Sequence, residues 1–229
     1  MSYTANEIVC DMPACIMCGM CRDACYAEAI TQAGKEIDAV SMVSLLERDA
    51  QVFGRAYGVT FSGGEPLLQH IYLKEVLVRL KQCRIHTAID TAGCVPWEYF
   101  EEVLPYVNTF LYDVKGIDLN THIKYTSAEN ILILANLRRL TEVRGMDVWI
   151  RVPLISGIND KYEDIQRLGE FLAGLSGFAR LDLLPYHNYG IYKARSIGIQ
   201  EYEFEMPSEK SLRRIQLQLR QMGLDSNIL

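Results

Sequence analysis

The sequence predicts an α/β fold in which a parallel sheet is covered by helices. From residue 40 onward, short runs of β-branched and aromatic residues alternate with amphipathic stretches long enough for helices, which is typical of strand–helix–strand units. The 229 residues, 49% of them hydrophobic, suit one sizeable domain with a small appendage. The unusual polar residues lie at the carboxyl ends of the predicted strands, where parallel sheets place their binding sites.

We expect strands at 58–62, 86–91, 107–114, 147–152 and 180–185. We expect helices at 40–53, 67–81, 97–104, 130–144, 160–176 and 208–222, because apolar residues recur there at helical spacing. Pro96 precedes the third helix, where prolines open helices. Gly145 predicts a left-handed C-cap for the fourth helix, and Asp160 with Glu163 predicts a capping box for the fifth.

Composition excludes several classes of protein. The net charge of -6 and the absence of a basic run interleaved with aromatics argue against nucleic-acid binding. No stretch approaches the roughly 18 apolar residues of a membrane span. The first 15 residues contain Glu7 and Asp11 and no apolar core of signal-peptide length. We therefore expect a protein of the reducing cytoplasm, with no membrane contact.

Five of the seven cysteines lie before residue 26, and four of them form a C-x2-C-x2-C-x3-C run: Cys15, Cys18, Cys21 and Cys25. This is the ligand spacing of bacterial ferredoxins, so the run predicts an iron-sulfur cluster, with buried or disulfide-bonded cysteines as the alternative. In two-cluster ferredoxins the fourth cysteine of this run ligates the other cluster, and here Tyr26 replaces the usual proline. The fourth ligand is therefore open between Cys25, Cys10 and a cysteine outside the chain.

The composition changes around Gly34, which divides the chain into an iron-sulfur segment, 1–35, and a larger domain, 36–229. The isolated Cys83 and Cys94 are interpreted as ordinary small residues.

Residues typical of binding sites lie at the carboxyl end of each of the five predicted strands, within its last residues or just after it. They are Gly63, Gly64 and Glu65, then Asp90 and Thr91, then Asp113 and Lys115, then Arg151, and finally His187. Each alone has a structural explanation: a helix cap, a surface lysine or a loop histidine. Because the carboxyl ends of parallel strands meet at one edge, their coincidence predicts one shared polar site.

The turn from Ser62 to Pro66 could be a tight strand-to-helix connection and nothing more. Beside an iron-sulfur segment it has a second interpretation. Two glycines let the backbone approach a ligand, and Glu65 can accept hydrogen bonds from a cationic amine. With Lys115 and Arg151 available for a carboxylate, the site suits a zwitterionic amino-acid group.

Five segments, in order, resemble the glycyl radical enzyme activating enzymes, the pyruvate formate-lyase activase group of the radical SAM family: Gly58–Leu67, Asp90–Gly93, Tyr112–Lys115, Ile150–Asp160 and Leu184–His187. The resemblance implies a partial TIM-like (β/α)6 barrel that binds S-adenosylmethionine at its mouth. It also implies that the cysteine run is a ferredoxin-like insert carrying an auxiliary 4Fe-4S cluster.

The resemblance also assigns roles, and we expect that Asp90, Asp113, Lys115 and His187 position the cofactor and that none of them is a general acid or base. Gly63, Gly64 and Glu65 match the motif that holds the methionine amine, and Asp113 and Lys115 match an Asp-x-Lys pair. Arg151 and His187 match positions that contact the rest of the cofactor. Asp90 and Thr91, with Asp113, match residues that frame a monovalent cation site.

The chain departs from the family at one point. The C-x3-C-x2-C loop that holds the catalytic 4Fe-4S cluster does not occur in these 229 residues. The spacing closest to that loop is formed by Cys10, Cys15 and Cys18, and it would take two cysteines from the ferredoxin-like run. We expect that the first barrel strand and its cluster loop belong to a segment missing from the amino terminus.

The resemblance implies that the complete enzyme, a monomer, cleaves S-adenosylmethionine reductively to a 5'-deoxyadenosyl radical and generates a glycyl radical on a partner enzyme. The electron would come from a donor such as flavodoxin or ferredoxin. Two alternatives stay open: a noncatalytic iron-sulfur protein that binds S-adenosylmethionine, including an inactive truncated fragment, and a radical SAM enzyme acting on a small molecule.

Overall fold

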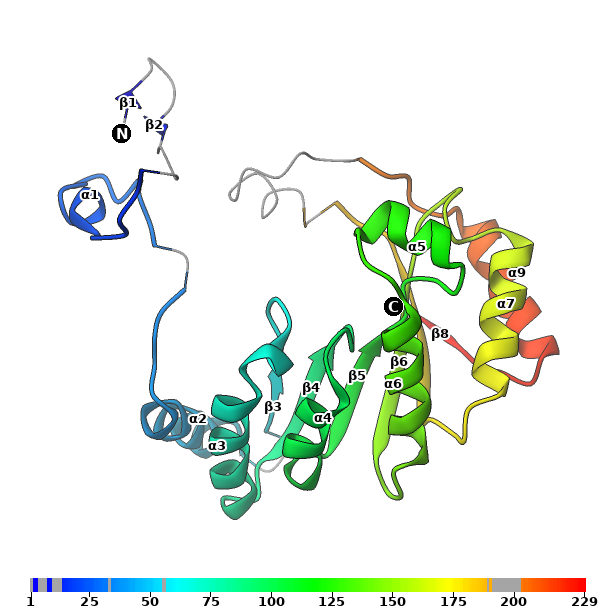
Figure 1. The fold of residues 1–229 in the computed structure, drawn as a ribbon, viewed down its shortest axis with the longest axis horizontal. Helices are drawn as coiled ribbons and strands as arrows, with labels where there is room; N and C mark the ends of the chain where they lie inside the picture. Colours follow the sequence, from blue (N-terminus) through cyan, green and yellow to red (C-terminus); the bar gives the residue numbers. More distant parts are fainter. Residues whose placement is uncertain are drawn as a thin grey trace. The chain divides into compact units, whose positions relative to one another are not determined.

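The computed structural model describes residues 2–3, 8–9, 14–32, 34–54, 57–188, 190 and 203–229 (Figure 1). The chain divides into two compact units, Met1–Asp38 and Ala39–Leu229. In the described ranges no helix is long and apolar enough to cross a membrane.

In its described residues the first unit has little regular structure. Strands β1 (Ser2–Tyr3) and β2 (Ile8–Val9) pair antiparallel, and α1 is one turn, Met20–Asp23. The residues before α1 have positive φ angles at Met17 (54°) and at Gly19 (77°), which is the N-cap of the helix. The backbone therefore takes left-handed conformations at two positions between cysteines of the run.

The second unit contains a six-stranded parallel sheet in sequential order, β3-β4-β5-β6-β7-β8. Its strands are β3 (Gly58–Phe61), β4 (His86–Thr91), β5 (Thr109–Asp113), β6 (Asp147–Leu154), β7 (Arg180–Pro185) and β8 (Asn227–Ile228). The predicted α/β class with a parallel sheet is confirmed, and Figure 1 follows these strands from cyan to red.

Helices precede and connect the strands of this unit. They are α2 (Ala39–Phe53), α3 (His70–Gln82), α4 (Trp97–Val103), α5 (Leu119–Thr126), α6 (Ile131–Glu142), α7 (Tyr162–Ala173) and α9 (Glu209–Gln221), with 3-10 turns η2 (Pro66–Gln69) and η3 (Leu104–Tyr106). The Ser208 side chain caps α9 by accepting from Ser211 N, and Gly223 follows the helix with a φ of 80°. The predicted boundaries of this last helix are therefore confirmed.

Two predicted caps are wrong. Helix α6 already ends at Glu142, so Gly145, with a φ of 79°, lies in the turn to β6 and not at the helix end. Asp160 does not cap α7, whose N-cap is Lys161. Its carboxylate instead accepts from Gly157 N over 2.7 Å, because the preceding loop folds back on it.

The core lies between the sheet and its helices, and strand β6 shows how the sequence places it. Its residues alternate between partly buried and fully buried, with Val148, Ile150, Val152 and Leu154 on the buried side. These side chains pack with apolar residues of α6 and α7. Because side chains alternate along a strand, Arg151 projects from the opposite face.

The Cys83 thiol, at the end of α3, donates a hydrogen bond to Glu47 Oε1 over 2.8 Å. This bond, and to a lesser extent burial, raises the pKa of the Cys83 thiol. Because the thiolate is the reactive form, we expect Cys83, although exposed, to react with iodoacetamide at pH 8 more slowly than it does in a Glu47→Ala variant, as mass spectrometry of the labelled peptides would measure.

Glu47→Ala should leave the labelling of Cys94 unchanged, and equal rates at Cys83 in the variant and in the unsubstituted chain would contradict the prediction. The raised pKa also means that the bond stabilises the fold while the thiol is protonated. That stabilisation is lost as the pH rises through the folded-state pKa.

Candidate functional site

The predicted site residues of the second unit gather where the strands end. Asp90 and Thr91 close β4, and Asp113 closes β5. Asp113 and Arg151 are Cα partners across β5 and β6. Since paired residues on neighbouring strands point to the same face, the register alone brings this carboxylate and guanidinium together.

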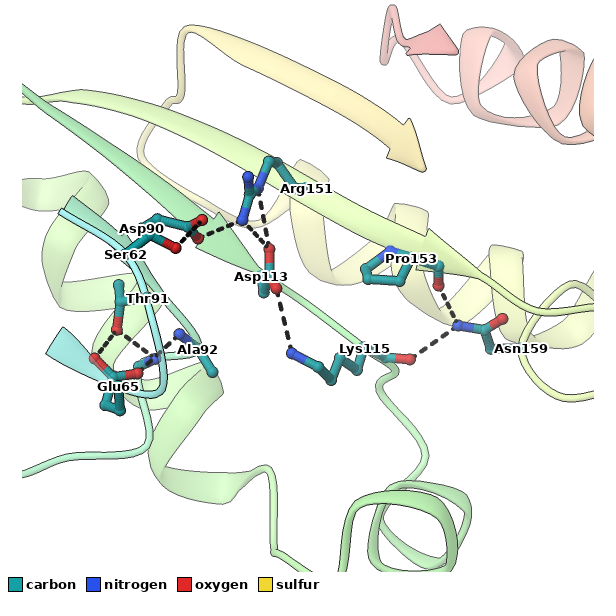
Figure 2. A network of polar contacts seen from close by, with 11 residues as sticks. Ser62, Glu65, Asp90, Thr91, Ala92, Asp113, Lys115, Arg151, Pro153 and Asn159 are labelled. Atoms are coloured by element: carbon teal, nitrogen blue, oxygen red, sulfur yellow. Dashed lines mark hydrogen bonds and ion pairs between the residues drawn. The ribbon is translucent and has the colours of Figure 1, made fainter. Parts of the chain in front are cut away.

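Arg151 is the centre of an ionic network (Figure 2). Its Nε and one Nη donate to Asp113 Oδ1 over 3.1 and 2.8 Å, and the same Nη donates to Asp90 Oδ1. Ser62 Oγ donates to the other Asp90 oxygen over 3.0 Å, and Lys115 Nζ lies 3.3 Å from Asp113 Oδ2. The three central side chains are each about one-fifth exposed, so a ligand could reach them.

Glu65 forms a second set of bonds beside the first. Its Oε1 accepts from Leu67 N over 3.1 Å and from the Thr91 hydroxyl over 2.7 Å, while its Oε2 accepts from Ala92 N over 3.0 Å. Thr91 Oγ1 in turn accepts from Gly93 N over 2.9 Å. One carboxylate therefore joins the loop after β3 to the loop after β4.

Gly93 lets this second loop approach β5. It has a φ of 72°, and a Cβ at this position would lie 1.7 Å from Tyr112 Oη. The Tyr112 side chain is fully buried and its hydroxyl donates to Ile133 O over 2.7 Å. Burial, reinforced by the charge of Glu65, raises the pKa of Tyr112 well above its usual value, so the hydroxyl stays a donor.

Asn159 supports the site from the loop after β6. Its side-chain amide donates to Lys115 O over 2.9 Å and to Pro153 O over 2.7 Å, and its oxygen accepts from Ile155 N. These bonds fix the backbone from which Lys115 projects toward Asp113 (Figure 2).

A cavity of about 340 Å³ also opens beside Lys115, between α5 and β6. Its lining includes Val152, on the helix-covered face of β6, and Leu168 of α7. Lys115, Pro153 and Asn159 also line it, so the cavity adjoins the ionic network at Lys115.

The structure therefore joins Asp90, Asp113, Lys115 and Arg151 in one network, and Glu65 with Thr91 in another. Gly63, with a φ of 135°, has no atom within 4 Å of where a Cβ would be, so the glycine pair presents open backbone. His187 is exposed two residues beyond β7, and the described bonds of the two networks do not include it.

Sequence reasoning missed three residues that hold these loops: Ser62, Asn136 and Asn159. Asn136 is a buried amide on the apolar face of α6, and it donates to Gly93 O and Val95 O. A polar residue among apolar helix positions was the available signal, because a buried amide requires hydrogen-bond partners.

The four cysteines of the run lie in the first unit and are free, as are the other described cysteines. Cys18 and Cys21 are exposed, and Cys15 and Cys25 are half-buried. Cys10 lies outside the described residues. Within the described ranges, no three His, Cys, Asp or Glu side chains are close enough together to hold a metal ion.

Comparisons with known proteins place the chain in a family. Residues 13–169 match the model of the Radical SAM superfamily. The chain is 36% identical over 203 residues to the 4-hydroxyphenylacetate decarboxylase activating enzyme of Clostridioides difficile (strain 630), covering 87% of this chain and 63% of that enzyme. It therefore spans less than two-thirds of that relative's length.

A shorter relative is covered more fully. The pyruvate formate-lyase-activating enzyme of Staphylococcus epidermidis is 36% identical over 193 residues, which cover 80% of this chain and 76% of the relative. The crystal structure of a domain of pyruvate-formate lyase-activating enzyme from Bacteroides vulgatus has a TM-score of 0.65 and 34% identity. That match covers 76% of this chain and 99% of the crystallised domain. The chain thus belongs to the radical SAM superfamily, within its group of glycyl radical enzyme activating enzymes.

Proposed function

We propose that the complete protein activates a glycyl radical enzyme, and that this chain supplies its binding site for S-adenosylmethionine. The observation that carries the proposal is the cluster of Asp90, Asp113, Lys115 and Arg151 at the carboxyl ends of β4, β5 and β6. It lies beside an open glycine turn, so cationic side chains and accessible backbone face the same edge of the sheet.

The donors and acceptors suit the amino-acid end of the cofactor. Lys115 and Arg151 can bind a carboxylate, and both are already oriented by Asp113. Glu65 accepts three hydrogen bonds, two at Oε1 and one at Oε2. Because each carboxylate oxygen accepts about two bonds, one site at Oε2 is left for the methionine amine. Gly63 and Gly64 would let the backbone pass close to the same group, and His187 would contact the rest of the cofactor.

A monovalent cation fits the present arrangement poorly. The resemblance assigns it to Asp90, Thr91 and Asp113, but the guanidinium of Arg151 spans the two carboxylates. A cation between them would have to displace that guanidinium, so we assign no step to it.

We propose that Cys15, Cys18, Cys21 and Cys25 ligate an auxiliary 4Fe-4S cluster. The donor set supports this, because four free thiols within 11 residues are the ligands that such clusters use.

In the complete enzyme, a donor such as flavodoxin or ferredoxin would reduce a catalytic 4Fe-4S cluster. This cluster and S-adenosylmethionine would together supply a 5'-deoxyadenosyl radical, which would take a hydrogen atom from a glycine of the partner. The residues of this chain would position the cofactor and exclude water, with no general acid or base among them. Hydrogen abstraction requires close approach, so the partner's glycine loop must reach the same sheet edge.

The activity is tested with the complete protein. Mixed without oxygen with S-adenosylmethionine, a one-electron reductant and either pyruvate formate-lyase or 4-hydroxyphenylacetate decarboxylase, it should produce a glycyl radical signal in electron paramagnetic resonance. No radical in either partner, with both clusters present, would contradict activation of these two enzymes.

The binding site is tested with this chain. Asp113→Ala should weaken S-adenosylmethionine binding roughly tenfold or more in calorimetry, because Lys115 and Arg151 both lose the carboxylate that orients them. Asp164→Ala is the matched control, since Asp164 is also an ion-paired carboxylate of similar exposure, on α7. Unchanged binding by Asp113→Ala would exclude the assigned role.

A further inference from the structure

Arg151 has a carboxylate on each side at the same level of the sheet. Asp113 of β5 and Asp182 of β7 are both Cα partners of Arg151. Since residues in register on adjacent strands point to the same face, both carboxylates lie within reach of its guanidinium. The described bonds of Arg151 nevertheless go only to Asp113 and Asp90.

Asp182 is held by other donors. Its Oδ1 accepts from Arg180 Nε over 2.7 Å and from Asn227 Nδ2 over 3.0 Å. Asp182 is only 1% exposed, so water cannot replace these donors if one is lost. Arg180 is the cation in this set, and its charge neutralises the buried carboxylate.

Arg180 is itself fixed in place. Its guanidinium lies over the ring of its strand partner Trp149, 4.8 Å from the centroid. The indole Nε1 donates to Asp147 Oδ2 over 3.1 Å, and Thr109 Oγ1 donates to the same oxygen. The face of the sheet that carries the site therefore has two separate ion pairs, Arg151 with Asp113 and Arg180 with Asp182.

We propose that Arg180 is a positioning residue: by neutralising Asp182, it leaves Arg151 directed toward Asp90 and Asp113 at the site. Without Arg180, a buried and unneutralised carboxylate would stand beside Arg151. The attraction between the two would be strong, because the carboxylate is shielded from water. Arg151 would then turn toward β7 and lose its alignment with the candidate cofactor site. This inference rests on the proposed function for its consequence, but not for the orientation of Arg151.

The test uses three variants of this chain. Arg180→Met removes the charge and keeps an unbranched side chain over Trp149. Asp182→Asn removes the competing charge, and the double variant Arg180→Met/Asp182→Asn removes both. Crystal structures of the variants give the orientation of Arg151, calorimetry gives the affinity for S-adenosylmethionine, and thermal unfolding shows that each variant is folded.

Arg180→Met should turn Arg151 toward Asp182 and weaken binding roughly tenfold, the size of one charge-assisted hydrogen bond. The double variant should restore both the orientation and the affinity, which a merely structural role would not do, and Asp182→Asn alone should change neither. If Arg151 stays on Asp113 in Arg180→Met, or if the double variant binds as weakly as the single one, the inference is wrong. If the unsubstituted chain does not bind S-adenosylmethionine, the proposed site fails, and the crystal structures of Arg180→Met and the double variant still decide the inference.

Discussion

Gly93→Ala is expected to destabilise the second unit by about 2–5 kcal/mol, the sum of a left-handed backbone cost and an overpacking cost. The new methyl group would lie 1.7 Å from Tyr112 Oη and 2.2 Å from its Cζ, so one of the two residues must move. Tyr112 cannot move cheaply, because it is fully buried and its hydroxyl bonds Ile133 O. Gly93 is held by Asn136, which donates to its carbonyl.

Gly145→Ala is the matched control for this prediction. Gly145 has a similar φ of 79° but no atom within 4 Å of where a Cβ would be. Gly145→Ala should therefore lower the free energy of unfolding only by the cost of a left-handed backbone conformation, about 1–2 kcal/mol. Urea unfolding of both variants measures the difference, and equal losses would show that the close approach to Tyr112 does not matter.

The strands were predictable because apolar side chains mark them directly. The eight residues of β6 alternate in burial along their whole length, as a strand covered by helices on one face requires. Helix α5 was not predicted, since its eight residues, Leu119–Thr126, contain one buried side chain, that of His122. Strand β8 is two residues long and is defined by its pairing with β7, which no local pattern encodes.

The location of the site was predictable for a similar reason, since parallel strands bring their carboxyl ends to one edge. The partners within it were not. Whether Arg151 bonds Asp113 or Asp182 depends on the register and on Arg180, and neither is visible in the spacing of the residues. Glu65 likewise matched a ligand-binding motif. In the structure its carboxylate also joins two loops, by accepting hydrogen bonds from Leu67, Thr91 and Ala92.

Because the same side chains hold the loops and would bind the cofactor, the site is ordered before the cofactor binds. The carboxylates of Glu65 and Asp113 are fixed by donors of the protein before any ligand arrives. A site whose side chains are already ordered loses less conformational entropy on binding. Substitutions in it should therefore affect both the stability of the fold and the affinity for the cofactor.

Arg151→Met is the second substitution with a large expected effect. It would leave the carboxylates of Asp90 and Asp113 close together without the guanidinium that now bonds both. Breaking a fully buried ion pair costs about 3–5 kcal/mol. Because these side chains are about one-fifth exposed, water can solvate them in part, and we expect a loss of about 1–3 kcal/mol in urea unfolding.

The origin of that loss is tested by removing one of the two charges as well. In Arg151→Met/Asp113→Asn only Asp90 stays charged, and Ser62 still donates to it, so most of the lost stability should return. Raising the salt concentration should also reduce the deficit of Arg151→Met, because ions screen the repulsion between partly exposed carboxylates. Loss of packing by the arginine side chain would give a deficit that neither Asp113→Asn nor salt relieves. The same arrangement explains why a guanidinium occupies this position. Its planar group can bond two carboxylates from neighbouring strands at once and fixes their directions, whereas a lysine ammonium would constrain those directions less.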